Sequence, residues 1–391
     1  MTMDDNKIIE KEPLKSPIKI GAVGVFNNDF SSSIFFSNGF EKLDSVSSVI
    51  RYDYRENLKR RINIASDLLD LSRGVDLVII MKGSGIPLQA IKLCSKQCST
   101  LFWMMDIYSH FTRNQRLLEN SLFCDYRTAT GYGTCKLWGE RIKLPVHHIL
   151  DGSDTSIYYP TKTRKSYDVT FIGGTDRERD AVYNFIKNRY KVKFFGPKYS
   201  RRFIRPDEFR QICNSSKIVL NISRGKLEGY SSLRLWNLLA CGSMVMTKHI
   251  PNMRERMGLE ADKNIVDFSN FLELQRKLDY YLEHSDKREE VEKEGLEFLR
   301  NNRTWKHTAG EIVDLVTNKP GKSFMPDITS LIIPLKKRPT NRRIFPKRRT
   351  PGIRKRKIKT SLKRQTNDVP KKPETSPGIS RRVKAGWVTA A

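Results

Sequence analysis

Short apolar runs alternate with amphipathic stretches over most of the first 320 residues, which is the pattern of an α/β protein. In the first half, helices are predicted at 31–43, at 58–71 and from Pro87 to about Cys98. The strands predicted between them lie at 18–26, 46–54, 75–81, 100–105 and 124–130, and the first of them is a near-continuous apolar run. Strands of this kind are buried on both faces, which indicates a parallel sheet covered by helices.

The same alternation begins again at Tyr167. Strands are predicted at 167–173, 192–195, 218–222 and 243–247, a helix at 178–189, and mainly helical structure at 270–318. The predicted fold class is therefore α/β, with two Rossmann-like parallel-sheet domains. Its predicted parts are a polar leader at 1–16, an N-terminal domain at 17–150, a linker at 151–166, a C-terminal domain at 167–320, and a basic, disordered tail at 321–391.

Composition narrows the class of protein further. A hydrophobic fraction of 38% excludes global disorder, and no apolar run approaches the length of a membrane helix. The N-terminus is acidic where a secretion signal is basic and then apolar, so we expect a soluble, cytoplasmic protein. The six cysteines are scattered without the spacing of a zinc site, which favours reduced thiols and no structural metal. The sequence leaves the oligomeric state open.

The net charge of +29 is concentrated near the C-terminus. Residues 336–384 contain 20 basic side chains and two acidic ones, so this segment alone carries +18. Such a segment binds polyanions through counterion release or surface potential, which predicts DNA or an anionic surface as its partner. The only aromatic residues after position 335 are Phe345 and Trp387, so stacking on bases is not indicated. A solubilising or tethering role remains the alternative.

The segment 220–242, LNISRGKLEGYSSLRLWNLLACG, is the most informative stretch for function. It predicts a buried strand, a loop of small and basic residues, and a helix from about Ser232 to Cys241. A loop that leads into a helix N-terminus is suited to bind a phosphate. Arg224, Lys226 and Arg234 have the charge to neutralise a diphosphate. The alternative is an ordinary loop with solvated charges.

Several motifs in order make the sequence resemble a known family. The segments YDVTFIGG, LNISRG, LRLWNLLACGSMVMT and RTWKHTAGEIVDLV are similar to the C-terminal domain of CgeB-like glycosyltransferases, which have the GT-B fold. The resemblance covers about residues 100–318, and in the first half it is carried by LFWMMDIY and LDGSDTSIYYP. It implies two facing domains with a cleft between them, a nucleotide-diphosphate sugar, expected to be a UDP-sugar, in the second domain, and an acceptor hydroxyl at the first.

The resemblance also implies roles for single residues. Those that correspond to the donor site are Gly173, Gly174, Arg177, Ser231, Ser232, Arg234 and Asn237. At Asn237 the family usually has a glutamate that binds the ribose hydroxyls, so this chain loses a charge-assisted hydrogen bond there. Glu228 does not begin the Glu-x7-Glu pattern of related retaining enzymes, because position 236 is Trp.

For the chemical step, the candidate bases are two carboxylates that follow first-domain strands and one nearby histidine. Asp106 closes the strand TLFWMM, His110 lies one helical turn later, and Asp29 follows the first strand. The alternatives are helix caps for Asp106 and Asp29 and a surface position for His110. The chain has no Asp-x-Asp motif, so we expect a hexosyltransferase-type enzyme that needs neither metal nor cofactor. The sequence leaves open whether the anomeric configuration is kept.

Two further functions remain as alternatives. The basic tail raises the possibility of a glycosyltransferase that acts on modified bases in DNA. The departures at Trp236 and Asn237 also allow a catalytically inactive nucleic-acid-binding protein on a GT-B scaffold. Gly-x-Gly-x-x-Gly is absent from the first-domain loops, which argues against a dinucleotide site.

Overall fold

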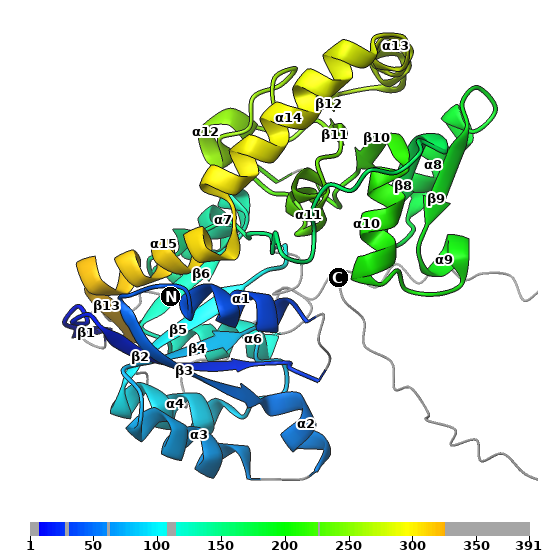
Figure 1. The fold of residues 1–391 in the computed structure, drawn as a ribbon. Helices are drawn as coiled ribbons and strands as arrows, with labels where there is room; N and C mark the ends of the chain where they lie inside the picture. Colours follow the sequence, from blue (N-terminus) through cyan, green and yellow to red (C-terminus); the bar gives the residue numbers. More distant parts are fainter. Residues whose placement is uncertain (1–7, 28–30, 61–62, 108–114, 226, 325–391) are drawn as a thin grey trace, which may run out of the picture. The chain divides into compact units, whose positions relative to one another are not determined.

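The computed structural model describes residues 8–27, 31–60, 63–107, 115–225 and 227–324, all within one compact unit at 1–332. These residues form two parallel sheets covered by helices and one two-stranded antiparallel sheet (Figure 1). The predicted fold class of two Rossmann-like α/β domains is confirmed. The predicted site residues Asp29, His110 and Lys226, and the tail from 325 to 391, lie outside the described residues.

The first sheet has six parallel strands. Their spatial order is β3 (Val46–Asp53), β2 (Ile18–Gly24), β4 (Leu77–Met81), β5 (Ser99–Met104), β6 (Tyr126–Ala129) and β7 (His147–His148). Side chains of β4 alternate between two cores, with Ile79 in one and Val78 and Ile80 in the other, as burial on both faces requires. The strands predicted from the sequence match the observed strands of this sheet to within a few residues at each end.

The helices of the first half follow these strands. They are α1 (Ser32–Phe40), α2 (Tyr54–Lys59), α3 (Ile64–Arg73), α4 (Leu88–Gln97), α6 (Gln115–Leu122) and α7 (Tyr132–Ile142). Ser31 caps α1 as predicted, because its side chain accepts a hydrogen bond from Ser33 N. The single helix predicted at 58–71 is instead two, since Asn63 caps α3 by accepting from Ser66 N.

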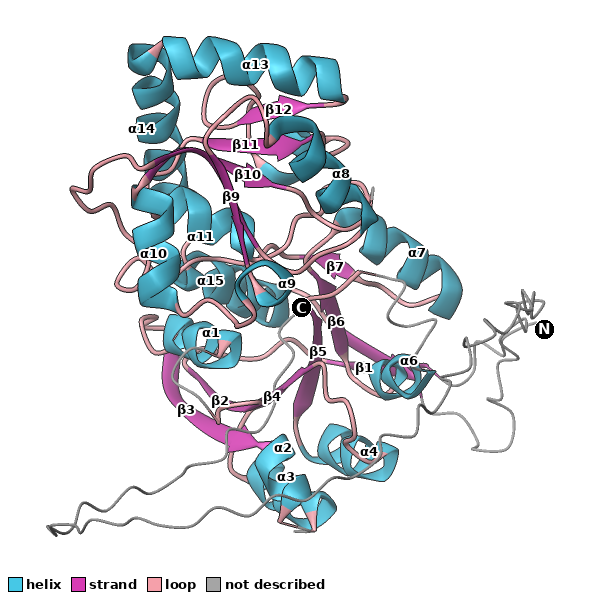
Figure 2. Cartoon of the chain, turned by 90° about the vertical axis from the view of Figure 1, so that its right-hand side faces the viewer, coloured by secondary structure: helices cyan, strands magenta, loops and turns pink. Residues whose placement is uncertain are grey.

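The second sheet has five parallel strands. Their order is β12 (Val266–Phe268), β11 (Val245–Lys248), β10 (Ser216–Asn221), β8 (Tyr167–Ile172) and β9 (Val192–Phe195). Its helices are α8 (Arg177–Ile186), α9 (Pro197–Ser200), α10 (Pro206–Asn214), α11 (Arg234–Ala240), α12 (Met253–Met257), α13 (Phe271–Glu283) and α14 (Ser285–Asn302). The core of α10 and α11 lies on one face of the sheet and that of α8 and α13 on the other (Figure 2). Sequence reading missed β12, which is only three residues long.

The last helix, α15 (Trp305–Asn318), packs against α1 of the first half. The rings of Trp305 and Phe36 lie 5.8 Å apart, and a Cβ at Gly39 would collide with the backbone of Trp305. Beyond α15, β13 (Gly321–Phe324) pairs with β1 (Ile8–Lys11) in antiparallel fashion. Part of the predicted leader and part of the predicted tail thus form a strand pair. Each strand has only four residues, which is too short for an alternating apolar pattern to predict it.

Candidate functional site

The loop between β8 and α8 lies at the carboxyl end of the second sheet. Asp176 caps α8, because its carboxylate accepts a hydrogen bond of 3.0 Å from Arg179 N. Gly173 has a φ of 158°, and a Cβ there would lie 2.6 Å from Nη1 of Arg234. Glycine at this position therefore lets the guanidinium of Arg234 pass directly over the loop.

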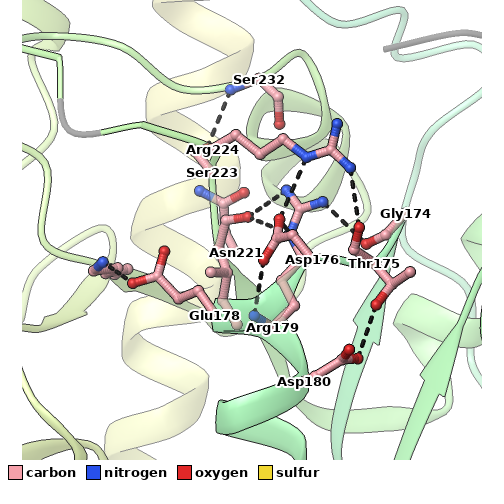
Figure 3. Close-up of polar contacts among 12 residues, drawn as sticks. Gly174, Thr175, Asp176, Glu178, Arg179, Asp180, Asn221, Ser223, Arg224 and Ser232 are labelled. Atoms are coloured by element: carbon pink, nitrogen blue, oxygen red, sulfur yellow. Dashed lines mark hydrogen bonds and ion pairs between the residues drawn. The ribbon is translucent and has the colours of Figure 1, made fainter. Parts of the chain in front are cut away.

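Three arginines converge on this loop and on the end of β10, and Figure 3 labels two of them, Arg179 and Arg224. Arg179 is 5% exposed and donates to Gly174 O at 3.0 Å and to Ile222 O at 3.0 Å and 2.6 Å. Arg224 donates to Thr175 O at 3.1 Å and, like Arg179, forms an ion pair with Asp176. The single carboxylate of Asp176 thus serves two guanidinium groups.

Arg234 completes this basic cluster. It donates through Nη2 to Asn221 Oδ1 and to Ile222 O, each at 3.1 Å. Burial and the nearby charge of Arg179 lower the pKa of Arg234 to about 9, and burial also lowers the pKa of Arg179. Closely spaced, partly desolvated cations are destabilised without a counter-charge, so the cluster formed by Arg179, Arg224 and Arg234 favours binding of an anion.

A hydrogen-bond network fixes the backbone between β10 and α11. Asn221 donates to Ser231 Oγ at 3.1 Å and to Thr247 Oγ1 at 3.0 Å, and the hydroxyls of Ser223 and Ser231 are 2.9 Å apart. Ser232 N donates to Ser223 Oγ at 3.3 Å, as Figure 3 shows. Within the described part of the chain, the buried atoms Ser232 Oγ and Arg234 Nε have no hydrogen-bond partner. Such atoms call for a partner that the protein itself does not provide.

The network contains two residues that the site prediction omitted, Asn221 and Ser223. Both lie in the motif LNISRG, so the signal was present in the sequence. The helix prediction was wrong at its start, because α11 begins at Arg234 rather than at Ser232. Leu233 at the N-cap provides no side-chain hydrogen bond, and α11 is only 7 residues long. Anion binding here therefore depends on side chains more than on a helix dipole.

A second group of polar residues lies at the carboxyl end of the first sheet. Asp106, which follows β5, is 7% exposed, and its Oδ2 lies 2.5 Å from Nζ of Lys82. Lys82 follows β4 and has a φ of 60°, a conformation that is costly for a residue with a side chain. Strain of this kind is typical of functional sites, since the surrounding structure must hold it in place.

Asp151 is a buried acid beside this pair that sequence analysis did not select. It is 2% exposed, and burial together with the charge of Asp106 raises its pKa to about 8, although Lys82 acts in the opposite direction. Asp151 lies in LDGSDT, a segment that we interpreted as a polar linker. The pKa of Tyr230, next in the chain to Ser231, is raised chiefly by burial and further by the charges of Asp106 and Asp151, whereas Arg234 and Arg179 act in the opposite direction.

With this geometry established, the chain can be compared with known proteins. A family model described as glycosyl transferase-like matches residues 177–314, which include α8, β10 and α11. The match covers about a third of the chain and shows what this region is similar to. The predicted class of protein, a glycosyltransferase, is thereby confirmed. No curated protein sequence matches the chain significantly.

Several solved structures are similar to the chain, and some of them are named as glycosyltransferases. HepE from Anabaena, in complex with UDP-glucose, has a TM-score of 0.58 at 11% identity, over 77% of this chain and 100% of its own. A glycosyltransferase from Rickettsia africae ESF-5 has a TM-score of 0.52 at 12% identity, over 77% and 98%. A DNA-modifying β-glucosyltransferase has a TM-score of 0.50 at 14% identity, over 77% and 100%. At these identities the likeness establishes the fold, which is the predicted GT-B arrangement.

Within residues 177–314, two predicted donor residues lie differently from expectation. Arg177 is exposed at the first position of α8, whereas Arg179 occupies the buried position beside the loop. Asn237 is buried, and its Oδ1 accepts a hydrogen bond of 2.8 Å from Ser153 Oγ. Glu228, set aside on sequence grounds, accepts hydrogen bonds of 2.9 Å from Asn252 and from Arg256.

A cavity of about 580 Å³ includes Arg256 in its lining. It is lined by His147, His148, Ile149, Leu150, Arg256, Arg303, Glu311, Asp314, Leu315, Asn318 and Lys319. Of the predicted donor and catalytic residues that the structure describes, none lines it. Over the described ranges there is no cluster of three or more His, Cys, Asp or Glu side chains arranged to hold a metal ion, and no helix is both long and apolar enough to span a membrane.

Proposed function

We propose that this glycosyltransferase moves a hexose from a UDP-sugar to an acceptor hydroxyl, with the donor bound at the carboxyl ends of β8 and β10. The supporting observation is the cluster of Arg179, Arg224 and Arg234, next to the unpartnered atoms Ser232 Oγ and Arg234 Nε. A diphosphate supplies both the negative charge and the acceptor oxygens that this cluster lacks. The finer resemblance to CgeB-like enzymes is part of the same proposal.

The arginines stabilise the leaving group in this proposal. As the bond between the sugar and the diphosphate breaks, negative charge accumulates on the diphosphate, and preorganised guanidinium groups stabilise it at little reorganisation cost. They provide the charge compensation for which other glycosyltransferases use a divalent metal, so transfer proceeds without one. Gly173 and Gly174 allow the backbone to approach the donor, and Ser231 holds the network in place. Lys226 and Arg177 remain predicted outer contacts.

Asp106 is the proposed general base for the acceptor hydroxyl. Its carboxylate is held beside Lys82 at the end of β5, and Tyr230 connects this position electrostatically with the arginines. A base that deprotonates the acceptor implies direct displacement and therefore inversion at the anomeric carbon. Glu228 is tied to Arg256, which further argues against the double displacement of a retaining enzyme. The free state of all six cysteines supports the expected cytoplasmic location.

A thermal-shift comparison of UDP, GDP and ADP tests the donor site. We expect UDP to raise the melting temperature most, since ligand at 100 times its Kd adds about 2.7 kcal/mol of stability. Arg234→Gln should abolish this shift, whereas Arg300→Gln, at an exposed position of α14, should preserve it. An unchanged UDP response in the Arg234→Gln protein, or no response to any nucleotide in the wild type, would contradict the proposal.

A second candidate function concerns the acceptor. The charge of +18 at 336–384 and the likeness to a DNA-modifying β-glucosyltransferase favour modified bases in DNA as the acceptor. Five of these basic residues lie at 354–359, and changing them to Gln in the full chain should reduce the salt dependence of duplex DNA binding by up to about four units in log–log slope. Equal slopes in both proteins would leave this segment without a role in polyanion binding.

A further inference from the structure

The cavity of about 580 Å³ has the size of a small-molecule site. One of its walls is a single face of α15, because Glu311, Asp314, Leu315 and Asn318 lie at positions i, i+3, i+4 and i+7 of that helix. Three of these four side chains are polar. The sequence of α15 therefore places a row of carboxylate and amide groups along the cavity.

The other walls come from both halves of the chain. β7, at the edge of the first sheet, and the two residues after it, Ile149 and Leu150, form one of them. Arg256 enters from α12, and its guanidinium lies 3.5 Å from the centre of the Tyr132 ring. The same ring lies 5.9 Å from the ring of His148 in β7. Since Ile149 and Leu150 are almost completely buried, the cavity combines an apolar base with polar walls.

The charges around this cavity are balanced. Arg256 Nε lies 2.9 Å from Glu228 Oε1, and Arg303 Nη1 lies 2.5 Å from Glu311 Oε1. The lining holds one further acid and one further base, Asp314 and Lys319. In the arginine cluster at the donor loop, by contrast, one carboxylate serves two guanidinium groups. A phosphate or sulfate would bring negative charge that the cavity does not compensate, so a neutral ligand fits it better.

Two buried nitrogen atoms of the lining have no hydrogen-bond partner among the described residues. They are Nε of Arg303, which can only donate, and Nε2 of His148. Burial, together with the charge of Arg303, lowers the pKa of His148 to about 4, so its imidazole is neutral near pH 7. A neutral imidazole nitrogen either donates or accepts, depending on the tautomer. A hydroxyl group suits both atoms, because it accepts from Arg303 and does either for His148.

We propose that the cavity lined by His148, Arg303 and the polar face of α15 binds a neutral saccharide. A saccharide carries adjacent hydroxyl groups on a ring whose C–H groups are apolar. Its hydroxyls can bond to the two nitrogen atoms and to the carboxylate and amide groups of α15, while its C–H groups cover Ile149 and Leu150. The site is separate from the donor arginines, and the inference does not rest on the proposed donor site.

The test is binding of the full chain to an array of immobilised neutral, sulfated and phosphorylated glycans. The neutral glycan with the strongest signal is then titrated in soluble form to obtain its Kd. We expect neutral glycans to bind, with a Kd that stays the same between about 50 and 200 mM salt, because no phosphate contact and no counterion release are involved.

Substitutions assign this binding to the cavity. His148→Phe keeps a ring beside Tyr132 but removes Nε2, and it should weaken binding by about tenfold or more. Asn318→Ala, at an exposed position on the cavity face of α15, should weaken it about threefold to tenfold through the loss of a hydrogen bond. Asn301→Ala, at an exposed position of α14 outside the lining, should have no effect, and neither should Arg234→Gln at the donor loop.

Three results would overturn the inference. They are no binding of any neutral glycan, binding confined to sulfated or phosphorylated glycans, and unchanged binding of neutral glycans by Asn318→Ala and His148→Phe. The exposed position of Asn318 keeps the test valid if His148→Phe does not fold. The proposed function has a separate readout. A chain that binds neutral glycans but shows no thermal shift with UDP keeps this inference and loses the donor site.

Discussion

The buried carboxyl group of Asp151 makes the stability of the protein depend on pH in a way that one substitution should remove. Its pKa is about 8 in the folded protein and 3.8 when the side chain is exposed. Between these values the folded state holds one more proton than the unfolded state. The free energy of unfolding therefore falls as the pH rises from about 4 to about 8. The sign is opposite to that of a salt-bridged acid, which loses its contribution as the pH falls.

The size of the effect follows from proton linkage. One differential proton changes the free energy of unfolding by about 1.4 kcal/mol for each pH unit. Between pH 5.5 and pH 7.5 the wild type should thus lose about 2 to 3 kcal/mol through Asp151 alone. Asp151→Asn is neutral at both pH values and lacks this contribution. The stability advantage of Asp151→Asn over the wild type should therefore grow by about 2 to 3 kcal/mol from pH 5.5 to pH 7.5, because unfolded wild type ionises Asp151 at both pH values and the folded protein does not.

Urea unfolding followed by tryptophan fluorescence at both pH values measures this difference in stability. The two proteins share every other titratable group, so the comparison cancels their contributions. The stability difference at pH 5.5 is the baseline, because the cost of replacing the buried carboxyl group with an amide is the same at both pH values. Parallel stability curves for the two proteins between pH 5.5 and 7.5 would refute the assignment of a retained proton to Asp151.

Further predictions concern the donor site and the core. Arg224→Gln should weaken UDP binding by roughly tenfold, because one charge-assisted hydrogen bond is lost, and calorimetry would measure this. Addition of EDTA should leave UDP release from UDP-glucose unchanged, and a loss restored by Mg²⁺ would contradict transfer without metal. Gly39→Ala should destabilise the protein by about 1 to 3 kcal/mol, because its Cβ collides with the backbone of Trp305; unchanged urea unfolding would contradict the packing of α15 on α1.

The sheets were predictable because their sequences satisfy one simple rule. Strands buried on both faces read as apolar runs, and β9 was predicted at its observed bounds, 192–195. The helix periodicity of 305–318 was equally clear, but it does not specify which sheet the apolar face covers. Packing of α15 on α1 depends on Gly39 and Trp305, residues 266 positions apart, so chain order alone does not reveal this contact.

At the proposed donor site, the sequence likewise does not determine which individual side chains are buried. Motif order located the loop and the helix, but Arg177 and Arg179 differ by two positions on α8, and only the burial of Arg179 distinguishes them. Asp151 was missed for a different reason. A passage rich in Asp, Gly and Ser is typical of an exposed turn, and its burial arises from the distant segment 303–308, which local sequence cannot reveal.

The position of Tyr230 connects the two halves of the proposed chemistry. It follows the loop glycine Gly229 and precedes Ser231 of the hydrogen-bond network, and its hydroxyl is influenced by the acids of the first sheet and the arginines of the second. A Cβ at Gly131 would lie 2.9 Å from the Tyr230 side chain, so α7 of the first half abuts the same loop. The loop between β10 and α11 is therefore packed against the start of α7. If the proposed donor site is correct, binding of a diphosphate by the arginines should change the environment of Tyr230 as well.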